Sequence, residues 1–239
     1  MIFVNDFSPV IFEIGPVGVR WYGVLFALGL VGFYLIVRWA FKRERLKVED
    51  LDSLALWIFF GIVVGARLGH VVFYRPWLIW QDPVEILRIW NGGLASHGAL
   101  IGVVVAYFVW CRLRRVKFGK YVNPIILGAP FAAMMVRIGN FVNSEIVGVQ
   151  TDGSWGVVFK GLGEGFPRHP AQLYEAGLLA VILAVFLVIY LKWRKMPDMF
   201  LGFLFLGLYF GGRFVIEFWK DLHVLPAGFP LSMGQVLSV

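Results

Sequence analysis

Residues 137 to 145, Arg-Ile-Gly-Asn-Phe-Val-Asn-Ser-Glu, place polar side chains at the end of an apolar run that begins at residue 123. An ionisable side chain inside a bilayer costs on the order of 2.5 kcal/mol or more, so its presence there indicates a functional site. The structural alternative is that Arg137 extends toward the lipid head groups or forms an ion pair that only stabilises the fold. Polar residues elsewhere in the chain decide between these interpretations.

The composition is that of an integral membrane protein. Apolar residues make up 59% of the 239 residues, and the mean hydropathy is +0.77. Soluble globular domains of ordinary composition do not approach these values. The N-terminal stretch carries Asp6 and Glu13 and has no basic start, so we expect a first span that stays in the mature protein.

Six apolar stretches are long enough to cross a bilayer core, which needs about 20 residues per helix. We therefore expect an all-α polytopic membrane protein with six transmembrane helices, forming one membrane-embedded domain over residues 1–239. The expected spans are 19–41, 53–74, 94–111, 123–142, 171–191 and 199–219.

Basic residues are distributed unevenly between the two sides of the membrane. The loops at 42–52, 112–122 and 192–198 carry twelve Lys and Arg residues, whereas the opposite side carries six. By the positive-inside rule the twelve face the cytoplasm, so the N-terminus lies outside. The net charge of +7 is therefore mainly a topology signal, compatible with contacts to anionic membrane lipids, and no nucleic-acid partner is expected.

Two longer connections lie on the outer side. Residues 75–93 are rich in tryptophan, which indicates an amphipathic segment anchored at the membrane interface. These tryptophans are Trp77, Trp80 and Trp90. Residues 143–170 are polar and glycine-rich with one β-like run at 155–160, and we expect a small extracytoplasmic head there.

Glycines recur at every fourth position in three of the expected helices, a spacing that lets helix backbones approach closely. They are Gly61, Gly65 and Gly69, then Gly98 and Gly102, then Gly207 and Gly211. We expect a compact bundle, although glycine is also generally common in membrane helices.

The topology converts sequence position into depth. Arg67, Arg137 and Arg213 each lie near the fifteenth residue of an outward-running span, about 20 Å from the cytoplasmic edge at ~1.5 Å per residue. Tyr22 and His97 each lie near the fourth residue of an inward-running span, and therefore close to the outer surface. The expected active site thus lies near the outer leaflet.

Further polar residues fall at the same level. Asn140 follows Arg137 by three residues and Glu217 follows Arg213 by four, so each pair shares a helix face and can interact. Independent snorkelling would scatter such residues between both interfaces. Several arginines at head-group depth suit a phosphate, because guanidinium groups bind phosphate oxygens in a bidentate way. The expected ligand is a phospholipid head group.

His97 is a candidate general base, because histidine side chains exchange protons near neutral pH. The structural interpretation of His97 is a hydrogen-bond donor without chemistry, and the arginines at its level favour the catalytic one. The histidines lack metal-ligand spacing and Cys111 is the single cysteine, so no metal site and no cofactor are expected.

At these residues the chain resembles bacterial prolipoprotein diacylglyceryl transferases, over nearly its whole length. The most specific block is Arg137 to Glu145, followed by Gly148. Other similar blocks begin at Arg20, Gly65, Gly92, Arg168, Gly212 and Ser232. The family usually has a seventh span after the block at Ser232, whereas this chain ends at Val239, so six spans are expected here.

The resemblance implies that diacylglycerol moves from phosphatidylglycerol to a cysteine thiol in the signal peptide of a prolipoprotein. A thioether forms, glycerol phosphate is released, and the reaction takes place in the bacterial cytoplasmic (inner) membrane. The residues implied in activity are Tyr22, His97, Arg137, Asn140, Glu145, Gly148, Arg213 and Glu217. We add Asn143 and Arg67 as candidates for substrate binding.

Within that chemistry, Arg137 and Arg213 are expected to clamp the phosphate and His97 to assist deprotonation of the thiol. Tyr22, Asn140 and Glu217 are expected to orient the reactants. Two alternatives use the same arginines differently. A transporter or channel for an anionic solute predicts polar groups at the bilayer midplane and beyond, and a lipid-binding scaffold without catalysis predicts that His97 is dispensable.

Overall fold

The structure is a computed structural model that describes residues 1–15, 17–89 and 92–221. Six helices in this part of the chain are long and apolar enough to cross a membrane. They are α1 (Trp21–Arg43), α2 (Val48–Tyr74), α4 (Ser96–Arg114), α5 (Val122–Val142), α6 (Ala171–Lys192) and α7 (Phe200–Ile216). The expected all-α, multi-pass membrane fold is confirmed, and each helix overlaps its expected span. The block at Ser232 lies outside the described residues.

Shorter elements occupy the connections. They are β1 (Ile2–Asn5), β2 (Val10–Ile14), β3 (Val17–Arg20), α3 (Leu78–Gln81), β4 (Gly156–Phe159), and the 3₁₀ turns η1 (Pro83–Leu87), η3 (Phe118–Tyr121), η4 (Lys160–Leu162) and η5 (Glu217–Trp219). The chain forms two compact units: unit 1 holds residues 1–40 and the described residues from 122 onward, and unit 2 holds Phe41–Tyr121. Each unit is described by itself.

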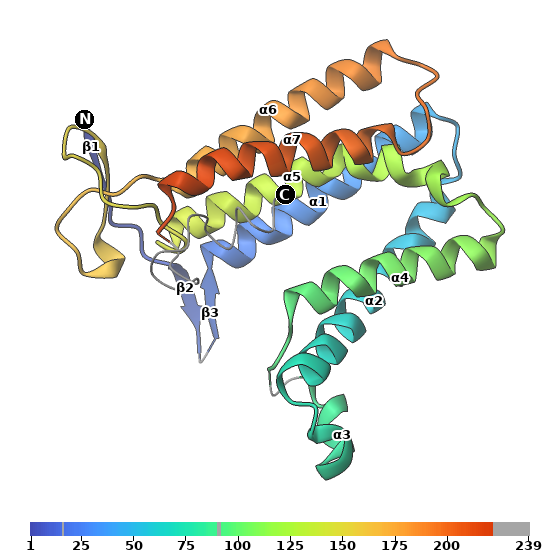
Figure 1. The fold of residues 1–239 in the computed structure, drawn as a ribbon, viewed down its shortest axis with the longest axis horizontal. Helices are drawn as coiled ribbons and strands as arrows, with labels where there is room; N and C mark the ends of the chain where they lie inside the picture. Colours follow the sequence, from blue (N-terminus) through green and yellow to red (C-terminus); the bar gives the residue numbers. More distant parts are fainter. Residues whose placement is uncertain (16, 90–91, 222–239) are drawn as a thin grey trace. The chain divides into compact units, whose positions relative to one another are not determined.

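Helix α5 is central in unit 1, because it packs against α1, α6 and α7 (Figure 1). Glycines make the contact with α1 close: a Cβ atom placed on Gly32 would meet the Phe131 ring at 2.0 Å. Apolar side chains fill the space among the helices, and burying them removes lipid or water contacts in favour of dense packing. One buried cluster consists of Ala40, Leu127, Ile182, Phe186, Tyr190 and Leu201.

One buried asparagine fastens the end of this bundle opposite the strands. Asn123, at the start of α5, donates from Nδ2 to the carbonyl oxygen of Pro197 (2.7 Å) and accepts from the backbone N–H of Leu201 (2.9 Å). Because buried backbone groups need hydrogen-bond partners, this side chain satisfies two such groups at the turn between α6 and α7. Asn123 thereby fixes the start of α7 against the start of α5.

The head of unit 1 contains more of the chain than residues 143–170. The expected β-like run is confirmed as β4, and β1 pairs with it in parallel, from Ile2 opposite Gly156 to Asn5 opposite Phe159. Asn5 is buried and donates from Nδ2 to the carbonyl oxygen of Phe141 at the end of α5 (2.7 Å). The N-terminal residues are thus part of the head. The pairing of β1 with β4 joins segments about 150 residues apart, which local sequence patterns do not specify.

In unit 2, α2 and α4 pack backbone to backbone through their glycines. A Cβ atom on Gly102 would approach the carbonyl oxygen of Gly61 to 2.0 Å, and one on Gly65 would approach that of Gly98 to 2.5 Å. The close approach expected from the four-residue spacing is confirmed here. Within the described part of the chain, nothing lies within 4 Å of a Cβ atom placed on Gly207 or Gly211, so the third set makes no such contact there.

The connection between α2 and α4 forms α3 and η1. Trp77 and Trp80 are exposed, as expected for side chains that anchor a segment at the membrane interface. The Asp82 side chain accepts from the backbone N–H of Glu85 (3.3 Å) and so caps η1. Trp90, the third expected anchor, lies outside the described residues.

We expect Gly102→Val to destabilise the pair of helices α2 and α4, because the added side chain overlaps the backbone of Gly61. Overpacking of this kind costs roughly 1–3 kcal/mol, and the melting temperature of the detergent-solubilised protein should fall by several degrees. Gly207→Val, where the described residues leave space, is the matched control. Equal melting temperatures for the two variants would contradict the packing described for α2 and α4.

Candidate functional site

Tyr22 is the second residue of α1, and its ring lies against the last turn of α5. A Cβ atom placed on Gly139 would approach Cδ2 of Tyr22 to 2.9 Å, closer than carbon atoms pack. Glycine at this position therefore lets the tyrosine ring lie against the α5 backbone immediately before Asn140. The sequence-predicted residues Tyr22 and Asn140 are thus brought to the same end of unit 1.

Arg137 begins a run of polar contacts that leads out of α5. Its Nη1 donates to Oδ1 of Asn140 (3.4 Å), which confirms that the two residues share a helix face. Asn140 Nδ2 donates in turn to one carboxylate oxygen of Glu145 (3.0 Å), and Asn143 Nδ2 donates to the other (3.2 Å). Two amides therefore fix the Glu145 carboxylate from both sides. Four predicted residues form one connected group.

The turn that carries Glu145 has an unusual backbone. Ser144 and Ile146, on either side of it, have φ angles of 57° and 55°. Positive φ is uncommon for residues other than glycine, and for a β-branched residue such as isoleucine it is a genuine outlier. The buried Gln172 holds this turn by donating from Nε2 to the carbonyl oxygen of Glu145 (2.6 Å). The protein thus enforces a strained turn at this position, as functional sites often do.

A buried glutamate that the sequence analysis did not single out lies at the centre of unit 1's charged groups. Glu175 is 0% exposed. Its Oε2 is paired with Nε of Arg137, and its Oε1 lies 2.5 Å from Nζ of Lys220. Among the described residues these contacts are ion pairs without aligned hydrogen bonds to the carboxylate. Depth could have revealed Glu175, because it is the fifth residue of an expected inward-running span.

Lys220 connects Glu175 to the second buried carboxylate. Its Nζ lies 3.5 Å from Oε2 of Glu217, and both side chains are almost completely buried. Lys220 is thus a partner of Glu217 that the sequence did not predict, while the expected pairing of Glu217 with Arg213 stays a prediction. Arg137, Glu175, Lys220 and Glu217 therefore form a chain of alternating charges, which we call the charge chain. Its two cations and two anions balance.

Arg213 lies in the last turn of α7, one turn before Glu217. Its Nε atom is buried and has no hydrogen-bond partner among the residues that the structure describes. A buried donor without a partner is costly, about 1–3 kcal/mol. The guanidinium of Arg213 therefore has hydrogen-bonding capacity that the described residues do not use.

Gly148 lies between two backbone segments that only glycine permits to come this close. Its N–H donates to the carbonyl oxygen of His169 (2.9 Å), and a Cβ atom at this position would meet the carbonyl oxygens of Trp219 and His169 at 2.4 and 2.5 Å. The next residue, Val149, donates to the carbonyl oxygen of Trp219 (2.9 Å). Gly148 thereby fixes the segment that carries Lys220. Its contribution to the site is positional.

Arg168 fastens the same region from the side of the head. Nε and Nη2 donate to the Glu164 carboxylate (2.5 and 2.8 Å), while Nη1 donates to Asp221 (2.6 Å) and to the carbonyl oxygen of Gly148 (3.1 Å). These hydrogen bonds from Arg168 hold the pKa of Glu164 below its usual value, and the same pairing raises the pKa of Arg168. Both groups therefore stay charged near neutral pH.

An aromatic cavity of about 390 Å³ also lies in unit 1. It is lined by Trp155, His169, Tyr174, Ile216 and Trp219. Nδ1 of His169 and the Tyr174 hydroxyl are 2.9 Å apart and share a hydrogen bond. Tyr174, Ile216 and Trp219 immediately precede three members of the charge chain in sequence, so the cavity lies beside the backbone that carries those members.

Arg67, in unit 2, uses its guanidinium inside the protein. It donates to the carbonyl oxygens of Ile86 (3.0 Å), Gly92 (2.5 Å) and Gly93 (3.3 Å), and also to that of Glu85. These bonds order the connection that leads into α4. Arg67 is 5% exposed, so the geometry favours positioning of that connection over direct contact with a ligand.

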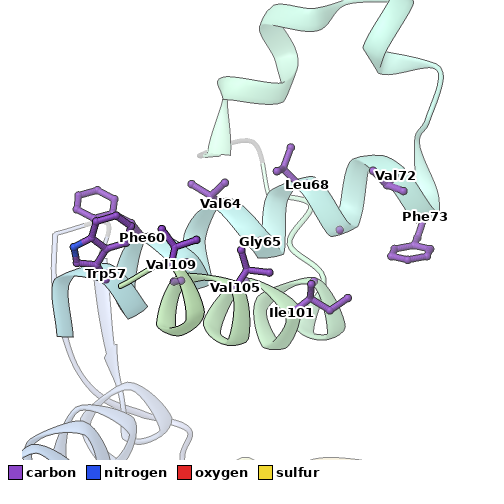
Figure 2. A pocket seen from close by; sticks show the side chains of 15 residues that line it. Trp57, Phe60, Val64, Gly65, Leu68, Val72, Phe73, Ile101, Val105 and Val109 are labelled. Carbon is purple, nitrogen blue, oxygen red and sulfur yellow. The ribbon is translucent and has the colours of Figure 1, made fainter. Parts of the chain in front are cut away.

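His97 is the second residue of α4 and its side chain is exposed. Its ring lies edge-on to Phe73 and tilted against Tyr74, with centroid distances of 5.0 and 5.8 Å. Phe73 also lines an apolar groove of about 470 Å³ along α2 and α4. Figure 2 shows Trp57 toward one end of this groove and Phe73 toward the other. His97 therefore lies at the Phe73 end of an apolar surface.

The structure thus brings most of the predicted residues together within unit 1, and it places His97 and Arg67 in unit 2. Those connected by contacts in unit 1 are Tyr22, Arg137, Asn140, Asn143, Glu145, Gly148 and Glu217. Sequence reasoning missed Glu175, Lys220 and Gln172, which hold this group in place.

Comparisons with known proteins give a consistent result. The family model described as prolipoprotein diacylglyceryl transferase matches residues 9–239. A phosphatidylglycerol–prolipoprotein diacylglyceryl transferase of Tolumonas auensis is 41% identical over 243 residues, covering 100% of this chain and 93% of that protein. Proteins of the same name from Chloroherpeton thalassium and Pasteurella multocida are 39% and 40% identical, covering 98% of this chain and 88% and 87% of their own lengths.

We expect Gly148→Ala to loosen the contact between the head and the end of α7, because its methyl group overlaps two carbonyl oxygens. The backbone amides at positions 148 and 149 should exchange hydrogen at least about tenfold faster. A tenfold increase in exchange rate corresponds to a loss of about 1.4 kcal/mol of local stability. Gly165→Ala, at an open position of the head, is the control. Unchanged exchange in Gly148→Ala would show that the close approach is not needed.

The pair of Glu164 with Arg168 makes the stability of the head depend on pH. Because the pKa of Glu164 is lowered in the folded state, the pair stabilises the protein above the unfolded-state pKa of about 4.3, and this contribution is lost as pH falls through the folded-state value. The melting temperatures of wild type and Glu164→Gln should differ at pH 6 and converge toward pH 3. A difference that stays constant over this range would contradict the assignment, and Glu13→Gln, at an exposed site, controls for general charge effects.

Proposed function

This chain belongs to the prolipoprotein diacylglyceryl transferase family, and we propose that it transfers diacylglyceryl from phosphatidylglycerol to a cysteine thiol of a prolipoprotein. The reaction is a displacement at a glycerol carbon. A carbon–sulfur bond forms, the bond from that carbon to the phosphate oxygen breaks, and glycerol phosphate leaves with the electron pair. The nucleophile belongs to the peptide substrate, so the enzyme must bind phosphate and accept a proton.

The observation that carries this proposal is a pair of arginines whose guanidinium groups the described residues use only in part. Arg137 is held on its Nε edge by Glu175 and has a side chain that is 17% exposed, and Arg213 has a buried Nε without a partner among the described residues. A phosphodiester carries one negative charge and offers oxygens that match the guanidinium geometry. As the leaving group departs its negative charge increases, so both arginines stabilise the transition state more than the bound lipid.

His97 is assigned as the group that accepts the thiol proton. A free cysteine thiol has a pKa of ~8.5 and reacts as the thiolate, so a nearby base increases the reactive fraction at neutral pH. His97 is exposed at the start of α4, beside the rings of Phe73 and Tyr74. An exposed imidazole at an apolar surface is accessible both to a peptide and to a lipid.

The remaining predicted residues orient the substrate or hold other residues of the site in place. The Tyr22 ring lies against Gly139, the residue before Asn140, and both side chains orient the bound head group. Asn143, Glu145 and Gly148 hold the turn after α5. Glu217 balances Lys220. We assign Arg67 to ordering the connection before His97, and the two units together to one catalytic domain.

The proposed setting is the bacterial cytoplasmic membrane, with the N-terminus outside and the active site near the outer leaflet. Support comes from the distribution of Lys and Arg among the loops and from the position of the charge chain at the strand-bearing end of unit 1 (Figure 1). Signal peptides of prolipoproteins are the proposed peptide substrates, since they present their cysteine at the membrane surface.

The test is transfer of labelled diacylglycerol from phosphatidylglycerol to a cysteine-containing signal peptide in detergent. We expect wild type to form a thioether product, Arg137→Ala to lower kcat/KM about 10²–10³-fold, and His97→Ala to lower it about 10²–10⁴-fold. Arg75→Ala, which removes an exposed arginine at the end of α2, should retain full activity.

Other results of this experiment would support one of the two alternative functions. A folded wild type that binds phosphatidylglycerol but forms no product supports the lipid-binding scaffold. Uptake of an anionic solute into proteoliposomes without product supports the transporter. Full activity of His97→Ala removes the histidine from its role as base while leaving the transfer itself intact.

A further inference from the structure

Glu175 has an environment that its position in an apolar helix does not require. It lies in the second turn of α6, is completely buried, and faces two cations at once, Arg137 on one oxygen and Lys220 on the other. A buried ion pair is weak evidence for stability, because desolvation of the charges offsets much of their attraction. A membrane-spanning helix that contains such a carboxylate therefore points to a role beyond folding.

The way in which Glu175 holds Arg137 is directional. The carboxylate takes the Nε atom of the guanidinium, while Nη1 reaches Asn140 (3.4 Å). Nε and one N–H of Nη1 are thereby held by the protein, which leaves the second N–H of Nη1 and both N–H groups of Nη2 for a ligand. A phosphate accepts two parallel hydrogen bonds from a guanidinium, so fixing Nε sets the direction in which the remaining groups can donate.

We propose that Glu175 is a positioning residue for transfer: it orients Arg137 toward the lipid phosphate and shares its charge with Lys220 so that the arginine is not neutralised. The inference rests on the proposed function. Lys220 is the second cation in this arrangement, because its Nζ pairs with the other oxygen of Glu175 and also with Glu217. Arg137 thus keeps enough positive charge to attract a monoanionic phosphodiester.

A purely structural role for Glu175 makes a different prediction. In that case Glu175 only neutralises buried cations, and any change that restores the balance of charge restores the protein. If Glu175 positions Arg137, balance alone is insufficient, because the guanidinium loses the carboxylate that fixes its Nε edge. Combining Glu175→Gln with Lys220→Met separates the two roles, because the pair removes one anion and one cation together.

The experiment compares wild type, Glu175→Gln, Lys220→Met and the double variant for melting temperature, kcat and KM for phosphatidylglycerol. We expect Glu175→Gln to lose about 100-fold in kcat with a change in KM of less than about fivefold, because a misdirected arginine affects the developing charge of the leaving group most. The double variant should recover melting temperature but not kcat. Asp6→Asn, which breaks an exposed pair with Lys160, should match wild type.

Recovery of kcat in the double variant would overturn the proposal in favour of simple charge balance, as would a kcat of Glu175→Gln near that of wild type. If Glu175→Gln does not fold, Glu175→Asp takes its place, because it keeps the charge and withdraws the carboxylate. An at least tenfold loss of kcat at an almost unchanged melting temperature then supports positioning, and wild-type kcat contradicts it. An inactive, folded wild type would instead count against the transferase function, so the two failures are distinguishable.

Discussion

The ion pairs of one buried carboxylate, Glu175, with Arg137 and Lys220 are the constraint on which the site depends. Removing one partner from a buried pair costs about 3–5 kcal/mol, because the other charge is left without compensation. The structure therefore has to bring α5, α6 and the segment after α7 to one point. Features far apart in sequence serve this requirement: Gln172 holds the turn after α5, and Gly148 holds the segment that carries Lys220.

Two kinds of packing create this arrangement. Close helix contacts through glycine set the distances, as where Tyr22 lies against Gly139 in unit 1. Backbone pairing in the head then fixes the ends of the helices, through β1 with β4 and through the hydrogen bonds of Gly148 and Val149. A membrane protein gains little from hydrophobic association between helices, so close packing and satisfied polar groups must provide the specificity.

Sequence patterns predicted the six helices well, because about 20 consecutive apolar residues have few other stable arrangements in a membrane. They also identified Arg137 with Asn140, since residues three apart share a helix face. They did not predict β1 with β4, whose pairing joins distant parts of the chain, or the two partners of Glu175, which come from α5 and from the segment after α7. Arg67 shows the limit of arguing from depth: its sequence position predicts the same level as Arg137, yet its guanidinium is taken up by backbone carbonyls.

The central claim is that Arg137 and Arg213 together bind the phosphate of the lipid. Solid-state NMR that measures dipolar dephasing between ³¹P of phosphatidylglycerol and ¹⁵N-labelled guanidinium groups in a bilayer tests it most directly, with Arg137→Lys and Arg213→Lys assigning the signals. The account predicts short-range dephasing for both arginines and none for Arg67. Dephasing at neither Arg137 nor Arg213, with the lipid bound, would contradict it.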